Sequence, residues 1–147
     1  MNWPLRVAAL LLLAWRRHWL RVAAFALAVL TSELFIGPVK DATERPRPPG
    51  ALIETTGASF PSGHAIATAV TAVGLVLVLA TPGPSRWRWE VHAVELTAVM
   101  ALSRVYLRAH WLSDTVAGAL LGAGLALGWP ALLQALRARR EAVAPPP

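Results

Sequence analysis

The chain has 147 residues, of which 56% are hydrophobic, and it contains no cysteine. This length predicts one domain, and the apolar composition, with a mean hydropathy of +0.50, is typical of a membrane protein rather than a soluble one. The lack of cysteine excludes disulfides, thiolate metal sites and cysteine nucleophiles. The formal net charge of +6 does not indicate nucleic acid binding, because most arginines fall in short clusters between apolar segments.

The first apolar segment, residues 5–14, is about half as long as a bilayer requires. It has two interpretations, a signal peptide or the end of a membrane helix whose beginning is absent. Trp15-Arg16-Arg17-His18 follows at once, without an A-x-A-like cleavage site, and this favours the second interpretation. A misplaced start codon or a naturally short chain would both produce such a segment.

Four longer apolar segments follow, at residues 19–39, 65–80, 91–107 and 112–136. They predict an all-α fold, a polytopic transmembrane bundle of about four spanning helices plus the short N-terminal helix. We expect a single domain over residues 1–141 and a disordered, proline-ended tail over 142–147. Glu33 lies inside the first span, where an acid is costly, and we expect it to pair with another helix.

The charged residues between these segments fall into two sets at alternate ends of the predicted helices. One set is rich in arginine and contains Arg16, Arg17, Arg21, Arg86, Arg88, Arg137, Arg139 and Arg140. The other mixes basic and acidic residues, namely Lys40, Asp41, Glu44, Arg45, Arg47, Glu54, Arg104, Arg108 and Asp114. The positive-inside rule places the first set in the cytoplasm. We therefore expect an integral protein of a bacterial inner (plasma) membrane whose mixed set faces the periplasmic or extracellular side.

The mixed set contains three motifs. The stretch Ser103 to Asp114 reads S-R-x5-H-x3-D, so that His110 and Asp114 are one helical turn apart. A carboxylate beside an imidazole holds one tautomer, which leaves the other ring nitrogen free as a nucleophile or base. Arg104 supplies a fixed fork of donors suited to phosphate oxygens.

The other two motifs add further groups that suit an anion. Lys40 to Pro48 reads K-x6-R-P, and Arg45 in it is either a surface charge or a helper of the site. Pro61-Ser62-Gly63-His64 precedes an apolar helix, with Ser62 as the expected N-cap. Gly63 allows close backbone approach, and the free N–H groups of a helix start favour an anion. His18 and His92 lie at the opposite membrane interface, and we interpret them as structural.

Together the three motifs resemble those of the type 2 phosphatidic acid phosphatase (PAP2) superfamily, which includes lipid phosphatases and vanadium haloperoxidases. The resemblance covers Lys40 to Asp114 at every defined position. It implies that His110 is a nucleophile forming a phosphohistidine, with Asp114 as its orienting partner and His64 as the general acid. It also implies that the phosphate is bound by Lys40, Arg47, Ser62, Gly63 and Arg104. Membrane members usually have six spanning helices, more than this chain offers.

The resulting prediction is a membrane phosphatase that acts on a lipid phosphate or diphosphate. The resemblance suggests undecaprenyl diphosphate, phosphatidic acid and phosphatidylglycerol phosphate as candidate substrates. No cofactor or metal is expected, because side chains supply the positive charge that phosphoryl transfer requires. Unpaired helix faces are compatible with a homodimer. Two alternatives are a non-catalytic or truncated binder of lipid phosphates and a vanadate-dependent haloperoxidase, whose known examples are soluble and much longer.

Overall fold

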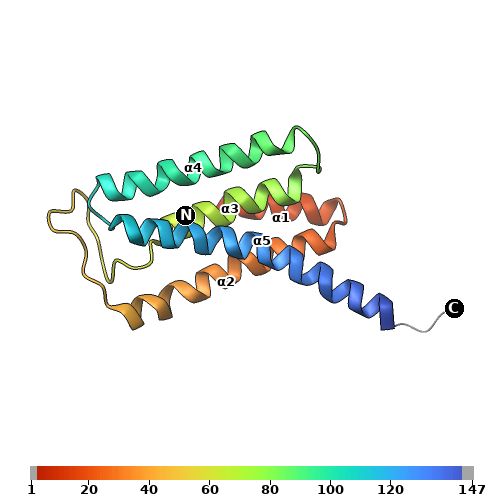
Figure 1. Ribbon diagram of the computed structural model, residues 1–147, viewed down its shortest axis with the longest axis horizontal. Helices are drawn as coiled ribbons and strands as arrows, with labels where there is room; N and C mark the ends of the chain where they lie inside the picture. The colour runs from red at the N-terminus through yellow and green to blue at the C-terminus, as the bar shows by residue number, and fades with distance from the viewer. Residues whose placement is uncertain (1–2, 144–147) are drawn as a thin grey trace.

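The computed structural model describes residues 3–143 as five α-helices, and no β-strand occurs in that range (Figure 1). They are α1 (Trp3–Trp15), α2 (Trp19–Thr43), α3 (Gly63–Leu79), α4 (Arg86–Tyr106) and α5 (Leu112–Val143). The predicted all-α fold is therefore confirmed. Residues 142 and 143, predicted to begin a tail, still belong to α5, and residues 144–147 lie outside the described range.

The helices match the predicted apolar segments. Of the four predicted spans, however, only α2 and α5 are both long enough and apolar enough to cross a bilayer. The third, α3, is apolar but has only 17 residues. The fourth, α4, begins earlier than predicted, at Arg86, and the ion pair of Arg86 with Glu90 one turn later supports this polar first turn.

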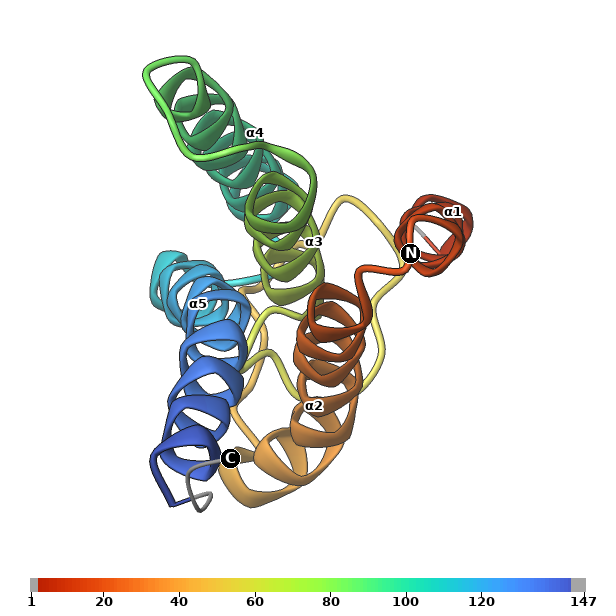
Figure 2. The same ribbon diagram turned by 90° about the vertical axis from the view of Figure 1, so that its right-hand side faces the viewer.

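The central element is α3, which contacts α1, α2, α4 and α5. Figure 2 shows α3 between α4 on one side and the pair α2 and α5 on the other. Eight of its residues are buried, among them Ile66 and Val70, which are fully enclosed. The site-bearing end of α3 is therefore held by packing on several sides.

Glycines allow α3 and α5 to approach closely. A Cβ added at Gly122 would lie 2.5 Å from the backbone oxygen of Ile66 and 2.9 Å from the Cβ of Ala69. A Cβ at Gly118 would lie 2.8 Å from the backbone oxygen of Ser62. Close packing at small residues is a common way for membrane helices to associate. The lack of a side chain at these two glycines therefore lets α3 and α5 pack closely.

We predict that Gly122→Ala destabilises the bundle by about 1–3 kcal/mol, because the new methyl group must push the α3 backbone away. Gly124→Ala is the matched control, since a Cβ there meets no atom within 4 Å. Thermal unfolding in detergent micelles should give a lower Tm for Gly122→Ala alone. Equal Tm values for the two variants would contradict the close α3–α5 contact.

A buried polar network joins α1, α2 and α3. The guanidinium of Arg6, 1% exposed, forms an ion pair with Glu33 at 2.9 Å and donates to the Thr71 hydroxyl at 2.8 Å. It also donates to the backbone oxygen of Ala67 at 3.1 Å. The predicted pairing of Glu33 with another helix is thus confirmed, and its partner lies in the short N-terminal segment.

Candidate active site

The three motifs meet at one end of the bundle. The C-terminal ends of α2 and α4 and the N-terminal ends of α3 and α5 all lie there, at the left of Figure 1, with the α2–α3 loop beside them. A cavity of about 410 Å³ opens at this end. Six of the eight predicted site residues line it, namely Lys40, Arg47, Gly63, His64, Arg104 and His110. The other two, Ser62 and Asp114, do not line it and are fully buried.

His110 lies between α4 and α5, and its ring is held by a backbone carbonyl. Its Nδ1 is 2.7 Å from the oxygen of Ser59. A carbonyl oxygen only accepts, so Nδ1 carries the proton and the Nε2 lone pair is free in the neutral ring. The ring is 5% exposed and lines the cavity. This tautomer is the one that a nucleophilic Nε2 requires.

Asp114 is expected to orient His110, but the hydrogen bonding differs from that expectation. Its Oδ2 lies 3.8 Å from Nδ1 of His110, which is too long for a hydrogen bond and within ion-pair range if the ring is protonated. Oδ2 instead accepts the backbone N–H of Trp111 at 2.9 Å, and Oδ1 accepts from Arg45 at 2.6 Å. Asp114 therefore acts on the ring through its charge, while Ser59 provides the direct contact.

The sequence leaves Arg45 open as either a surface charge or a helper of the site. Its ion pair with Asp114 joins a half-buried guanidinium to a fully buried carboxylate. The same guanidinium lies 5.8 Å from the centre of the Trp111 ring and donates to the Ser113 hydroxyl. A buried carboxylate is costly without a partner, so Arg45 belongs to the structure that supports His110.

Arg47 and Lys40 tie the α2–α3 loop together at the cavity wall. Arg47 donates to the backbone oxygens of Gly57, Thr56, Ala58 and Ala109. These four bonds occupy four of its five N–H groups, which leaves one for a ligand. Lys40 donates to the oxygen of Ala58 and keeps two further donors. Both cations therefore hold the loop while remaining at the cavity.

Arg104 and the first turn of α3 both carry N–H groups that no other part of the described chain accepts. Arg104 uses Nε for the hydroxyl of Ser103, and its two Nη groups have no hydrogen bond partner within residues 3–143. The first bond of α3 runs from Ile66 N–H to the oxygen of Ser62. The preceding N–H groups, from Gly63 to Ala65, are therefore free of helix partners and suit an anion.

Ser62 occupies the predicted N-cap position of α3, but its side chain makes no capping bond. Its hydroxyl oxygen is the one buried side-chain polar atom without a hydrogen bond partner in the described part of the chain. Its backbone N–H donates to the oxygen of Asp114 at 3.1 Å. A buried hydroxyl is expected to have a partner, so an unpaired one beside this cavity is consistent with a bound ligand.

Burial lowers the pKa of His110 below its ordinary value of 6.5. The Ser59 carbonyl and Asp114 oppose this shift, whereas the positive charges of Arg47 and Lys40 reinforce it. The ring is therefore expected to stay neutral at pH 6.5 and to protonate only at lower pH. NMR of ¹⁵N-labelled histidine in micelles, assigned with the His110→Asn protein, should give a pKa below 6.5. A value above 6.5 would contradict the buried, cation-flanked position.

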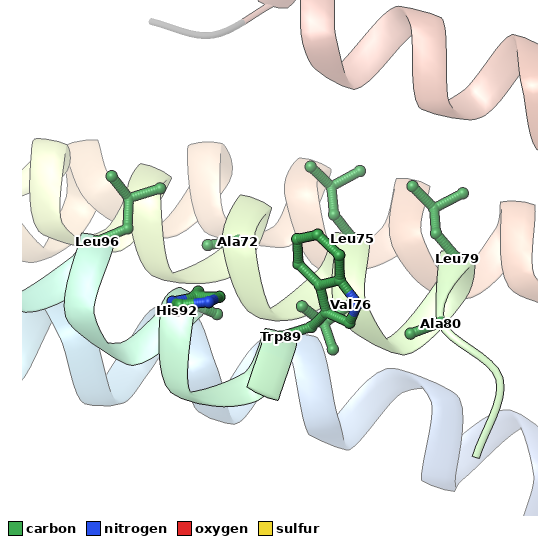
Figure 3. Close-up of a pocket in the computed structure, with 9 residues that line it drawn as sticks. Ala72, Leu75, Val76, Leu79, Ala80, Trp89, His92 and Leu96 are labelled. Atoms are coloured by element: carbon green, nitrogen blue, oxygen red, sulfur yellow. The ribbon is translucent and has the colours of Figure 1, made fainter. Parts of the chain in front are cut away.

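A second, larger cavity lies at the opposite end, between α3 and α4. It measures about 500 Å³ and has mostly apolar walls, with Leu75, Leu79, Trp89 and Leu96 around it (Figure 3). His92 is its single titratable residue and pairs with Glu95 on the same helix at 2.9 Å. No Lys or Arg of the described range lines this cavity, whereas three cations line the smaller, polar one.

Comparison with known proteins agrees with the motifs. Residues 21–138 match the PAP2 superfamily. The chain belongs to this superfamily. It is 28% identical to the first transmembrane PAP2 type phosphatidylglycerolphosphate phosphatase from Bacillus subtilis, whose crystal structure is known. That match has a TM-score of 0.75 and covers 92% of this chain and 68% of the other.

Two further relatives are similar in sequence. An undecaprenyl-diphosphatase of Sulfolobus acidocaldarius is 42% identical over 67 residues, 46% of this chain. A decaprenylphosphoryl-5-phosphoribose phosphatase of Mycolicibacterium smegmatis is 35% identical over 106 residues, 70% of this chain. The matched regions cover 30% and 53% of these two relatives, so this chain spans about half of their length or less.

Proposed function

We propose that this PAP2 protein is a membrane phosphatase that hydrolyses a lipid phosphate or diphosphate. The observation that carries the proposal is the convergence of two histidines and three cations on one cavity of about 410 Å³. The histidines are His64 and His110, and the cations are Lys40, Arg47 and Arg104. The names of the three relatives, each a phosphatase of a lipid-linked substrate, support the same class of reaction.

In the proposed first step, Nε2 of His110 attacks phosphorus and the bond from phosphorus to the leaving oxygen breaks. His64 gives its proton to that oxygen as it leaves. The three cations and the N–H groups at the start of α3 neutralise the charge that spreads over the equatorial oxygens. The charge of Asp114 stabilises the imidazolium that forms on His110. Ser62 and Gly63 complete the phosphate cradle.

In the proposed second step, water hydrolyses the phosphohistidine. His64, now neutral, takes a proton from the water, and the bond from phosphorus to Nε2 breaks. Inorganic phosphate leaves, and His110 returns to its neutral state with Nδ1 bound to Ser59. Each histidine thus ends in its starting protonation state, so the cycle needs no external proton donor beyond water.

We further propose that the site faces the periplasm of a bacterial inner membrane. The arginine-rich set lies at the far end of the helices, where Trp19, Trp87 and Trp89 are exposed as an interfacial belt would be. A phosphatase reporter fused after Arg140 should be inactive, since that end would be cytoplasmic. An active fusion would reverse the orientation.

The test of the proposed function is a phosphate-release panel with the purified protein in detergent. Phosphatidic acid, phosphatidylglycerol phosphate and undecaprenyl diphosphate are the substrates, and His110→Ala is the blank. We expect release from at least one lipid by the wild type and none above background by the variant. Binding of these lipids without turnover would contradict the proposal and favour a non-catalytic binder.

A further inference from the structure

One wall of the polar cavity is a short segment, residues 53–56, that none of the three motifs includes. The segment is fixed against the end of α4, because the N–H of Leu52 donates to the oxygen of Leu107 at 3.0 Å. Its other end is fixed by Arg47, which donates to the oxygen of Thr56 at 2.7 Å. The segment therefore lines the cavity from a backbone that is held at both ends.

This wall carries a carboxylate that the proposed mechanism does not use. Glu54 is exposed at the cavity, and no hydrogen bond or ion pair joins it to any other residue of the range 3–143. Every other charged side chain that lines the cavity is a cation, apart from the two histidines. The hydroxyls of Thr55 and Thr56 likewise have no hydrogen bond partner among the described residues.

An unpaired carboxylate beside an anion site has a definite effect on what binds next to the phosphate. It repels a second anionic group, by an amount that grows as water is displaced from the cavity. As an acceptor without donors, it instead binds hydroxyl groups, and threonine hydroxyls both donate and accept. The wall is therefore suited to an uncharged, hydroxyl-bearing group.

Resting on the proposed function, we propose that Glu54, Thr55 and Thr56 form a specificity subsite for the part of the substrate next to the scissile phosphate. The substrate class this selects is a lipid-linked polyol phosphate, in which a glycerol or sugar carries the terminal phosphate monoester. Its hydroxyls bond to Glu54 and the two threonines. A lipid diphosphate is disfavoured, because its second phosphate is bonded directly to the first and meets the Glu54 carboxylate.

The test compares kcat/KM for phosphatidylglycerol phosphate, which has a glycerol hydroxyl beside its terminal phosphate, with that for undecaprenyl diphosphate. Phosphatidic acid, which has neither a free hydroxyl nor a second phosphate, is the reference. We expect the wild type to prefer the glycerol phosphate over the diphosphate by at least about tenfold. Glu54→Gln should reduce this preference about tenfold, and Glu54→Lys should reduce it further.

Asp41→Asn is the matched control, because it removes one exposed acidic charge on the same side of the protein but outside this cavity. It should leave the ratio of the two kcat/KM values unchanged. A wild-type preference for the diphosphate, or a ratio that neither Glu54 variant moves, would overturn the assignment while leaving the phosphatase proposal intact. Hydrolysis of none of the three lipids would overturn the proposed function and the subsite with it.

Discussion

Replacing His110 with alanine is expected to lower phosphate release by at least about 10⁴-fold. The reason is that its Nε2 is the proposed nucleophile, since Nδ1 is bound to the Ser59 carbonyl at 2.7 Å. Water would then have to attack phosphorus directly, with only the cations and helix donors to assist. The measurement is single-turnover phosphate release from the best lipid of the panel.

The matched control for this variant is His92→Ala, which removes an exposed histidine at the other end of the bundle. It should retain the wild-type rate. Both variants should insert into membranes and elute as the wild type does in detergent, so that loss of folding does not explain the result. A His110→Ala protein with more than a tenth of wild-type turnover would remove His110 from the role of nucleophile.

Replacing His64 with alanine is expected to lower kcat/KM for a lipid phosphate by about 10²–10⁴-fold, the usual contribution of a general acid. His64 lies in the first turn of α3 and lines the same cavity as His110. The loss should shrink to less than about tenfold for p-nitrophenyl phosphate, because nitrophenolate leaves without protonation. The measurement is kcat/KM for both esters, which reports the steps through phosphorylation of the enzyme.

This dependence on the leaving group separates acid catalysis from simple binding. If His64 only bound the phosphate, its removal would affect both esters by the same factor. Equal losses for the lipid and the nitrophenyl ester would therefore contradict the role of general acid. His18→Ala, at the exposed turn between α1 and α2, is the histidine control and should change neither value.

The sequence was sufficient to predict the helices because their apolar lengths and flanking polar residues are local signals. The predicted spans that start at Trp19 and Leu112 begin at the same residues as α2 and α5 in the structure. Pro38 and Pro130 lie inside these helices without ending them, as membrane helices tolerate. The late predicted start of α4 reflects a charged first turn that hydropathy alone excludes from an apolar segment.

The residues of the candidate site could be predicted from the sequence, but the hydrogen bonds and ion pairs that hold them could not. The motif histidines and three of the predicted cations do line one cavity. The carbonyl of Ser59, which holds His110, is a backbone atom and leaves no sequence signal. The pairing of Arg45 with Asp114 joins residues 69 apart, and that of Arg6 with Glu33 joins residues 27 apart. Such partners follow only from the three-dimensional packing.

The most direct test of His110 as the nucleophile is to trap the proposed phosphoenzyme. The His64→Ala protein should be mixed with p-nitrophenyl phosphate and quenched in alkali, which preserves phosphohistidine, and its peptides then analysed by mass spectrometry. We expect close to one phosphate per chain, on His110, with none in a protein that also carries His110→Ala. Stoichiometric phosphate on any other residue would contradict the claim that His110 attacks phosphorus from one side while His64 serves the leaving oxygen on the other.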